Sequence, residues 1–302
     1  MATINVFDAN ATASLLDFKS LVDALAIASV QQDAGEIHSP VRVGVPLNGN
    51  GVVLSMPASA NDIAIHKLVS VSPDNATESL PTIFGTVTVC NGKTGRPEFI
   101  LDGPTVTARR TAALSMLGVR TLHPSTPNAF LIIGTGQQAQ THALAISALY
   151  PDARVFVKGL NVSFEHAFCQ ALAGEGMHVE PCGESIPAEV DTVITVTTSK
   201  APVYTEAAKA ARLVIGVGAF TPDAAEIAPE TVRASILFVD DLNATRAEAG
   251  DLIQADVDWS QVRTLGSAVN SEVRRDGPIL LKTVGSGAWD LAACRVARAA
   301  LK

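Results

Sequence analysis

A short stretch in the middle of the chain, "FLIIGTGQQA" (residues 130–139), has the residue types and spacing of a dinucleotide-binding turn. An apolar run ends at Gly134 and Gly136, and the small residue Ala139 follows at the third position of such turns. Glycine allows an unusual backbone angle and the close approach of a pyrophosphate, while the start of the next helix offers free N–H groups to that anion. The stretch therefore predicts a phosphate-bearing cofactor. An ordinary tight turn between a strand and a helix is the alternative.

The next apolar run, "RVFVKGL" (154–160), bears on which cofactor binds. NAD enzymes usually carry Asp or Glu at the end of this strand, where the carboxylate binds the 2'-hydroxyl of the adenosine ribose. Here the strand ends in Lys158, Gly159 and Leu160, so no carboxylate repels a 2'-phosphate and Lys158 can pair with it. We predict NADPH as the preferred cofactor, with NADH accepted as a second possibility. A solvated surface lysine is the alternative for Lys158.

The elements around the glycine turn follow a regular alternation of short apolar runs and helical stretches. Unbroken apolar runs are typical of strands buried on both faces of a parallel sheet. The runs are "AFLII" (129–133), "RVFV" (154–157), "DTVITV" (191–196), "RLVIGV" (212–217) and "SILFVD" (235–240). Helices long enough for crossovers lie between them, so the sequence predicts a doubly wound α/β domain of the Rossmann type.

The first part of the chain has a different pattern. A helix is predicted over about residues 11–32, followed by strands "VRVGVPL", "GVVLSMP", "HKLVSVS" and "PTIFGTVTVCNG", the last turning through "NGKTG" into "RPEFILDG". A further helix, "TARRTAALSMLG", is predicted to begin with Thr107 as its cap and to end the domain near Gly118. The amphipathic tail predicts a last helix. We therefore expect an α+β domain ahead of the α/β domain.

Composition restricts the class of protein. The chain has 302 residues, 47% of them hydrophobic, and a net charge of −8 without any basic run, which argues against nucleic-acid and anionic-membrane partners. The start, "MATINVFDAN", lacks the pattern of a secretory signal, and the most apolar window (129–150) is interrupted by polar residues, so a cytoplasmic location is expected. The four cysteines lie far apart, which favours reduced thiols, and no metal site is expected.

Several segments together resemble one family, the ornithine cyclodeaminase/mu-crystallin family. The matching stretches occur in order along nearly the whole chain: "SPVRV", "MPA", "HKLVSVSPDN", "LPTIFG", "TGRPEFILDGPTVTARRTAALS", "FLIIGTGQQAQTH", "VGAFTPDAAEI" and "LLKTVGSGAWDLAA". The turn "GTGQQAQTH" and the tail "KTVGSGAWDLAA" are most similar to the bacterial reductases of Δ1-pyrroline-2-carboxylate and Δ1-piperideine-2-carboxylate.

The resemblance implies an architecture and a substrate site. A Rossmann domain (119–284) is expected to be inserted in a substrate-binding and dimerisation domain (1–118), which the C-terminal helix (285–302) completes, and the protein is expected to be a homodimer. The positions that bind the substrate carboxylate fall on Arg42, Lys67 and Arg110, and Val284 would lie near the substrate. An arginine fork and a mobile lysine charge are suited to one carboxylate. Without the resemblance, a surface salt bridge would be the better interpretation of each.

The resemblance also implies the cofactor contacts. These are expected at Thr82, Gly134, Thr135, Gly136, Gln137, Gln138, Thr197, Val217, Gly218 and Thr283, in addition to Lys158. They follow strand ends or turns, where doubly wound sheets bind ligands.

One departure from the family separates its activities. The cyclodeaminases carry an acid or base Asp two residues before the proline of "P-x-x-x-E", and here Phe220 occupies that position in "FTPDAAE". A cyclodeaminase needs several proton transfers, whereas a ketimine reductase needs one hydride and one proton. Phe cannot move a proton, which favours the reductase. Asp223 lies close by in sequence and could replace the missing acid.

The resulting hypothesis is reduction of a protonated cyclic imine whose carboxylate is held by the three cations, giving L-proline or L-pipecolate. Lys67, or a water that it positions, is the first candidate for the proton donor. His66 and His142 are interpreted as structural, because His66 would face away from Lys67 if the segment is a strand. The rivals are an alanine dehydrogenase-type enzyme, an ornithine cyclodeaminase and a non-catalytic NADPH-dependent binding protein.

Overall fold

The computed structural model describes residues 4–273 and 275–302, which divide into two compact units. The first unit consists of Met1–Thr111 together with Ser286–Lys302, and the second of Ala112–Gly285. The second unit is thus inserted in the first. The division falls inside helix α3 (Gly103–Leu122), and the expected boundary at residue 118 lies in the same helix. In the described residues, no helix is long and apolar enough to cross a membrane.

The first unit is built on a six-stranded sheet in the order β1-β6-β5-β4-β3-β2. All neighbouring strands are antiparallel except β1 and β6. The strands are β1 (Asn5–Val6), β2 (Val43–Pro46), β3 (Val52–Ser59), β4 (Ile63–Val71), β5 (Ile83–Asn91) and β6 (Pro97–Asp102), with a short 3-10 helix at Pro73–Glu78. The predicted strands of this region are confirmed. The last strand pair turns through the predicted "NGKTG".

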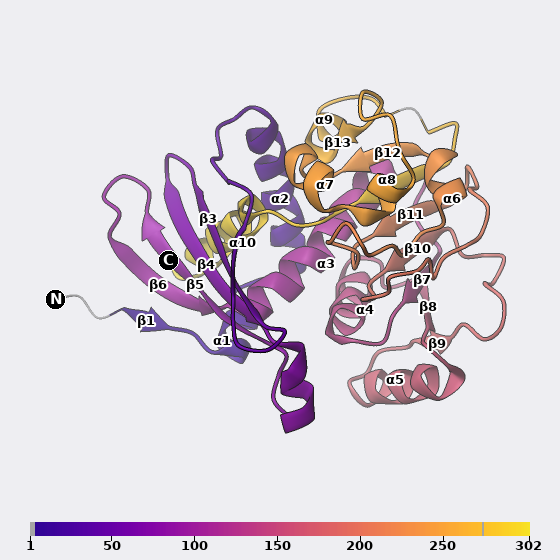
Figure 1. Cartoon of the computed structure of the whole chain (residues 1–302), viewed down its shortest axis with the longest axis horizontal. Helices are drawn as coiled ribbons and strands as arrows, with labels where there is room; N and C mark the ends of the chain where they lie inside the picture. Colours follow the sequence, from indigo (N-terminus) through magenta and orange to yellow (C-terminus); the bar gives the residue numbers. More distant parts are fainter. Residues whose placement is uncertain (1–3, 274) are drawn as a thin grey trace. The chain divides into compact units, whose positions relative to one another are not determined.

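One face of this sheet is buried and the other is exposed, because side chains alternate along each strand. On β4, Ile65, Lys67 and Val69 are buried while His66 and Leu68 are exposed. Helix α10 (Gly287–Ala300) packs against α2 (Phe18–Asp33) and against strands β3 and β4. Figure 1 shows α10 in yellow beside these strands. The C-terminal helix therefore belongs to the core of the first unit.

Two helix boundaries differ from the sequence prediction. The single helix expected over 11–32 is wrong: α1 (Ala9–Ser14) and α2 are separate, because Asp17 starts a new helix by accepting a hydrogen bond from the Ser20 N–H at 2.9 Å. The Thr107 cap is also wrong. Helix α3 begins four residues earlier, where the Asp102 carboxylate accepts from the Thr105 N–H at 2.8 Å. Thr107 is therefore inside the helix.

The second unit is an eight-stranded, wholly parallel sheet in the order β13-β12-β14-β11-β10-β7-β8-β9. All five predicted runs form strands. The strands are β7 (Ala129–Ile133), β8 (Arg154–Lys158), β9 (Glu180–Pro181), β10 (Thr192–Thr195), β11 (Leu213–Gly216), β12 (Ile236–Val239), β13 (Arg263–Thr264) and β14 (Ile279–Lys282). Every residue of β7, β10, β11 and β14 is buried, which explains the unbroken apolar runs.

Helices connect these strands and cover the sheet. They are α4 (Gln137–Leu149), α5 (Val162–Gly174), α6 (Pro229–Arg233), α7 (Leu242–Glu248), α8 (Gly250–Gln254) and α9 (Leu265–Val269). Strand β14 lies between β11 and β12 and was not predicted, although its apolar run "ILLK" carried the signal. The order reverses direction between β7 and β10, and ligands of doubly wound sheets bind at the carboxyl ends of the strands beside such a reversal.

Candidate functional site: a buried cation cluster and a set of strand-end loops

The first unit brings two of the predicted carboxylate-binding residues onto one buried acid. Lys67, on the inner face of β4, places its Nζ 2.6 Å from Oδ2 of Asp290, and the Nε of Arg110 donates to Oδ1 of Asp290 at 3.0 Å. Lys67 is 2% exposed, Arg110 6% and Asp290 fully buried. Strand β4, helix α3 and helix α10 each supply one member. We call Lys67, Arg110 and Asp290 the cation cluster.

The local structure explains why these side chains meet. Lys67 pairs in register with Met56 on β3 and Val87 on β5, so it lies in the middle of the buried face of the sheet. Its Nζ also donates to the Thr107 hydroxyl on α3 at 3.5 Å. The neighbouring Arg109 points elsewhere. Its guanidinium donates to the Leu16 carbonyl and lies 4.1 Å from the centre of the Phe18 ring.

Burial sets the charge of the cluster. The pKa of Lys67 is lowered from 10.5 to about 8, chiefly because burial removes the hydration of the ammonium group. The charge of Asp290 acts in the opposite direction and raises this pKa, whereas the charges of Arg110 and Arg42 lower it. Burial alone would raise the pKa of Asp290, but Lys67 and Arg110 outweigh it and hold that pKa below 3.8. At neutral pH, Lys67 is therefore cationic and Asp290 anionic. Two cations, Lys67 and Arg110, thus pair with one carboxylate, and the charge of Arg42 also acts on Lys67, which leaves an excess of positive charge.

Asp290 is the residue that the sequence reasoning missed. It lies in "GAWDLAA", a segment that was used only to recognise the family. A buried carboxylate between two buried cations is expensive unless each charge is paired, and removing one member of such a group is strongly destabilising. The signal in the sequence was a single acid among apolar residues, in the run Trp289 to Cys294.

The second unit holds the glycine turn and Lys158 together. The Gly134 N–H donates to the Lys158 carbonyl at 2.8 Å, which joins the turn after β7 to the end of β8. Gly134 has a φ of 132°, in the region that favours glycine, and a Cβ there would lie 2.9 Å from the Val196 carbonyl oxygen. Gly136 precedes α4, and no side chain caps that helix. Its first N–H groups are thus available to an anion.

The first carboxylate that follows this strand end in sequence is already used by the backbone. Glu165 is 3% exposed and accepts from the N–H groups of Gly159 at 3.1 Å and Gly183 at 3.4 Å. Lys158 is the partly exposed residue at the end of β8. The end of β8 therefore presents a cation.

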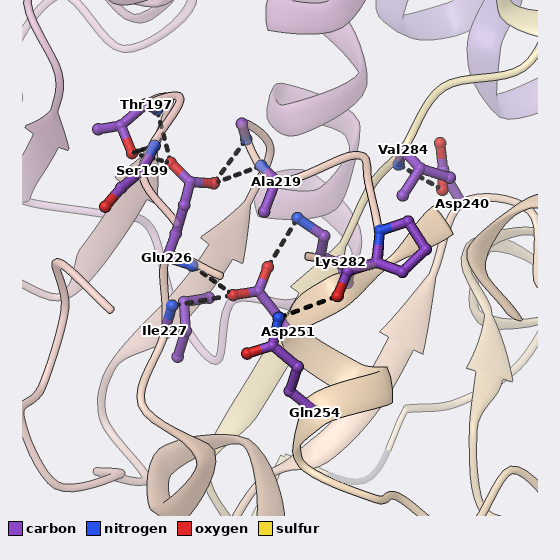
Figure 2. A network of polar contacts seen from close by, with 12 residues as sticks. Thr197, Ser199, Ala219, Glu226, Ile227, Asp240, Asp251, Gln254, Lys282 and Val284 are labelled. Atoms are coloured by element: carbon purple, nitrogen blue, oxygen red, sulfur yellow. Dashed lines mark hydrogen bonds and ion pairs between the residues drawn. The ribbon is translucent and has the colours of Figure 1, made fainter. Parts of the chain in front are cut away.

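Four predicted cofactor residues follow β10, β11 and β14 along the chain: Thr197, Val217, Gly218 and Thr283. Figure 2 shows Thr197 beside Glu226. Thr197 and Gly218 are tied together by Glu226, which accepts from the Thr197 N–H at 2.5 Å and from the Gly218 N–H at 2.6 Å. Val217 and Thr283 continue the sheet ladder through the carbonyls of Thr195 and Gly216. The structure thus gathers the predicted cofactor residues of the second unit at the carboxyl ends of its strands.

The two other predicted positions, Val284 and Thr82, belong to different units. The Val284 N–H donates to the buried Asp240 at 3.2 Å, so Val284 belongs to the second unit and not to the unit that carries the cation cluster. Thr82 belongs to the first unit, where its carbonyl accepts from the Ser72 N–H at 2.8 Å. Thr82 and the glycine turn therefore belong to different units.

The histidines have positions consistent with structural roles. His66 is on the exposed side of β4, opposite Lys67, with its Nε2 2.9 Å from the Ser55 hydroxyl. His142 is fully buried, its Nε2 is 2.9 Å from the Ser115 hydroxyl, and its Nδ1 is 2.7 Å from the Gln138 carbonyl. Burial lowers the pKa of His142 to about 4, so it is neutral at neutral pH.

This chain is similar to known proteins over nearly its whole length. The sequence profile of the ornithine cyclodeaminase/mu-crystallin family matches residues 5–298. The chain is 55% identical to Delta(1)-pyrroline-2-carboxylate reductase 1 of Burkholderia multivorans, over 98% of this chain and 96% of that protein. It is 52% identical to the Delta(1)-pyrroline-2-carboxylate/Delta(1)-piperideine-2-carboxylate reductase of Azospirillum brasilense, over 100% of this chain and 97% of that protein.

A solved structure has the same fold. Thermococcus litoralis Delta(1)-pyrroline-2-carboxylate reductase, in complex with NADH and L-proline, matches with a TM-score of 0.86 and 23% identity, over 98% of this chain and 97% of that one. The fold, the nearly full-length profile match and the identity above one half over the whole chain lead to one conclusion. This chain belongs to the ornithine cyclodeaminase/mu-crystallin family.

Proposed function

We propose that this chain is an NAD(P)H-dependent ketimine reductase that reduces the C=N bond of cyclic α-imino acids. The products are L-proline from Δ1-pyrroline-2-carboxylate and L-pipecolate from Δ1-piperideine-2-carboxylate. The observation that carries the proposal is the buried cation cluster, in a chain more than half identical to proteins named as reductases of these imines. An excess of buried positive charge favours a small carboxylate, and the glycine turn of the same chain favours a dinucleotide.

The cation cluster and Arg42 together bind and orient the substrate carboxylate. Arg42 and Arg110 supply guanidinium groups, and Lys67 supplies a point charge. Because Asp290 already occupies one side of Lys67 and Arg110, it fixes both side chains before substrate arrives. Pre-positioned cations lose little conformational entropy on binding, so more of the binding energy is available for orientation.

The cofactor residues of the second unit fit a nicotinamide dinucleotide. The uncapped start of α4 and the glycine backbone at 134 and 136 suit a pyrophosphate, and Lys158 suits a 2'-phosphate. NADPH is therefore the preferred cofactor in this proposal, and NADH is accepted more weakly. When bound, the nicotinamide supplies the hydride that reduces the imine carbon.

Lys67 controls the proton. Its pKa of about 8 keeps it protonated at neutral pH, so it holds a proton for the ring nitrogen, either directly or through a water that it positions. The ring nitrogen carries that proton while the imine carbon accepts the hydride, and the product is a neutral secondary amine beside the bound carboxylate. Above about pH 8 the lysine loses its proton and both functions weaken together.

The geometry disfavours the cyclodeaminase. Phe220, at the position of the family's acid, is 43% exposed and carries no ionisable group. Asp223, the possible replacement, forms an ion pair with Lys200 at 2.7 Å and accepts from the Thr221 hydroxyl at 2.7 Å. These contacts lower the pKa of Asp223 to about 2, so it cannot donate a proton at neutral pH.

The proposal also includes a homodimer formed through the exposed face of the six-stranded sheet. Val43, Val45, Leu68 and Phe84 are each more than 40% exposed, and the strand register places them on the same face. Contiguous exposed apolar side chains mark interaction surfaces.

Four free cysteines are in keeping with the reducing cytoplasm, where we place the protein.

The dimer is tested by mass. The double variant Leu68→Lys and Phe84→Lys is expected to be monomeric by light scattering coupled to size exclusion, while the wild type is dimeric. Leu160→Lys is the matched control, because Leu160 is 90% exposed in the second unit and outside this face. A wild-type monomer, or a double variant that remains dimeric, contradicts this surface.

The activity is tested with a panel of substrates and both cofactors. Δ1-pyrroline-2-carboxylate, Δ1-piperideine-2-carboxylate and pyruvate with ammonia are each offered with NADPH and with NADH, and L-ornithine with the oxidised cofactors. We expect cofactor oxidation with the two cyclic imines and a higher kcat/KM with NADPH. Turnover confined to pyruvate and ammonia would identify an amino-acid dehydrogenase. Conversion of ornithine to proline would identify a cyclodeaminase, and NADPH binding without turnover would identify a binding protein.

A further inference from the structure

The second unit contains a buried carboxylate that the proposed reaction does not use directly. Glu226 is fully buried, and its two oxygens accept four hydrogen bonds (Figure 2). Oε1 accepts from the Thr197 N–H at 2.5 Å and the Thr197 hydroxyl at 2.9 Å. Oε2 accepts from the N–H groups of Gly218 at 2.6 Å and Ala219 at 3.0 Å. One side chain thus joins the loop after β10 to the loop after β11.

The two loops approach each other closely at this point. A Cβ on Gly218 would overlap the Thr197 carbonyl oxygen, so glycine is required there. The backbone of Glu226 is held in turn by Asp251 on α8, whose Oδ1 accepts from the N–H groups of Glu226 at 2.6 Å and Ile227 at 2.9 Å. The carboxylate therefore has a fixed position relative to both loops.

The charges of this network do not cancel. Asp251 is balanced by Lys282, whose Nζ lies 2.9 Å from its Oδ2 in a fully buried ion pair. Within the described part of the chain, by contrast, no lysine or arginine forms an ion pair with Glu226. Four N–H and O–H dipoles stabilise Glu226 as an anion without neutralising it. The buried network keeps one net negative charge, and it lies on Glu226.

The position of this charge relates it to one half of a dinucleotide. In a doubly wound sheet the dinucleotide lies across the reversal of strand order, each half of the sheet binding one mononucleotide. The turn after β7 and the end of β8 carry the features for the pyrophosphate and the adenosine ribose. The loops after β10 and β11, which Glu226 joins, lie on the other side of the reversal and are left for the nicotinamide half.

We propose that Glu226 is a positioning residue that fixes the nicotinamide-binding loops and, by its unneutralised charge, favours the oxidised over the reduced bound cofactor. This inference rests on the proposed binding of NADPH or NADH. When the reduced nicotinamide gives up hydride, one C–H bond breaks and both of its electrons leave with the hydrogen, so the ring gains one positive charge. A fixed carboxylate in a poorly solvated site attracts that charge and thereby assists hydride donation.

Two variants separate charge from shape. Glu226→Gln keeps the size of the side chain and removes the charge, whereas Glu226→Asp keeps the charge and shortens the reach. Dissociation constants for NADPH and NADP+ are measured by titration calorimetry without substrate. For Glu226→Gln, we expect the Kd of NADP+ to rise about tenfold more than the Kd of NADPH. A tenfold change is the effect of an interaction strong enough to shift a pKa by about one unit. For Glu226→Asp, both constants rise and their ratio stays within about twofold of the wild type.

The outcomes distinguish this inference from the proposed function. If the wild type binds neither cofactor, the proposed function is wrong and the role of Glu226 is wrong with it. If the wild type binds both forms and Glu226→Gln leaves the ratio of the two constants unchanged, only the role of the Glu226 charge is overturned. Equal ratio changes in the Gln and Asp variants also overturn it, because a purely structural role moves both alike.

Thermal unfolding shows whether Glu226→Gln is folded. If it is misfolded, a second substitution still tests the inference. Lys282→Met removes the cation that balances Asp251 and leaves a second unneutralised carboxylate in the same network. Infrared spectroscopy shows whether Asp251 keeps its carboxylate band in this variant. With Asp251 ionised, the expected shift is opposite: the affinity for NADP+ improves relative to NADPH by about threefold or more, because a negative charge has been added. An unchanged ratio with Asp251 ionised, or a shift toward NADPH, overturns the inference.

Discussion

The cation cluster of the first unit and the strand-end loops of the second both contain buried carboxylates, but these carboxylates have different partners. Asp290 pairs with the side chains Lys67 and Arg110. Glu226 accepts mainly from backbone N–H groups of two loops. The groups that pair with the buried carboxylate are thus side chains in the first unit and mostly backbone N–H groups in the second. A single side-chain substitution should therefore disable the first region, whereas the second should be sensitive chiefly to added Cβ atoms.

The largest effect is expected for Lys67→Met. The substitution removes both a carboxylate ligand and the candidate proton donor, so kcat/KM for the cyclic imines should fall on the order of a thousandfold, within the range of lost general acid catalysis and lost charge pairing. The Kd of NADPH should change less than about twofold, because the cofactor residues grouped in the second unit remain intact. Steady-state kinetics and calorimetry measure the two. If the Lys67→Met enzyme is fully active, the proposed role of Lys67 is wrong.

The next effect concerns Asp290→Asn. Asp290 raises the pKa of Lys67 against the effect of burial, so its removal should lower that pKa below about 8. A group with a lowered pKa loses its proton earlier as pH rises, and the alkaline decline of kcat/KM should therefore begin at lower pH than in the wild type. At neutral pH we expect kcat/KM to fall about a hundredfold, because the candidate proton donor loses the carboxylate that positions it.

Asp62→Asn is the matched control for Asp290. Asp62 also pairs with arginines of α10, Arg295 and Arg298, but it is 44% exposed and outside the cation cluster. Its substitution should leave the pH profile unchanged. If Asp290→Asn and Asp62→Asn have the same profile, Asp290 does not control Lys67.

The backbone-built region is probed by two glycines. Gly134→Ala forces a Cβ against the Val196 carbonyl at a φ of 132°, and the free energy of unfolding should fall by about 2 kcal/mol. In Gly136→Ala, the Cβ meets no protein atom within 4 Å, so stability should be nearly unchanged while NADPH binding weakens. Chemical denaturation and calorimetry separate these effects. Equal loss of stability in both variants contradicts the distinction.

The smallest effect is expected for Lys158→Ala, whose side chain binds the 2'-phosphate in the proposal. The Kd of NADPH should rise about tenfold through loss of a charge-assisted contact to the 2'-phosphate, while that of NADH stays the same. Arg154→Ala on the same strand is the control, since Arg154 pairs with Glu180 and Glu189. A parallel change for NADPH and NADH shows that Lys158 does not read the 2'-phosphate.

Local sequence patterns predicted much of the fold because local physics determines them. The five unbroken apolar runs became buried parallel strands, and the turn-separated runs became the antiparallel sheet. Predictions failed where a competing local signal decided the outcome. Asp17 divided the first helix, and Asp102 started α3 four residues before Thr107. Both are short polar caps, whose contribution is comparable with that of the helix pattern itself.

The sequence by itself determined the family, the two kinds of sheet and the glycine turn beside Lys158, because each follows from periodicity or spacing within a few residues or from an ordered match along the chain. Only the tertiary structure decided which distant charges meet. Arg110 and Asp290 are 180 residues apart, and Glu226 reaches loops on two strands. No spacing rule encodes such pairs, since buried charges find their partners only when the elements that carry them pack together.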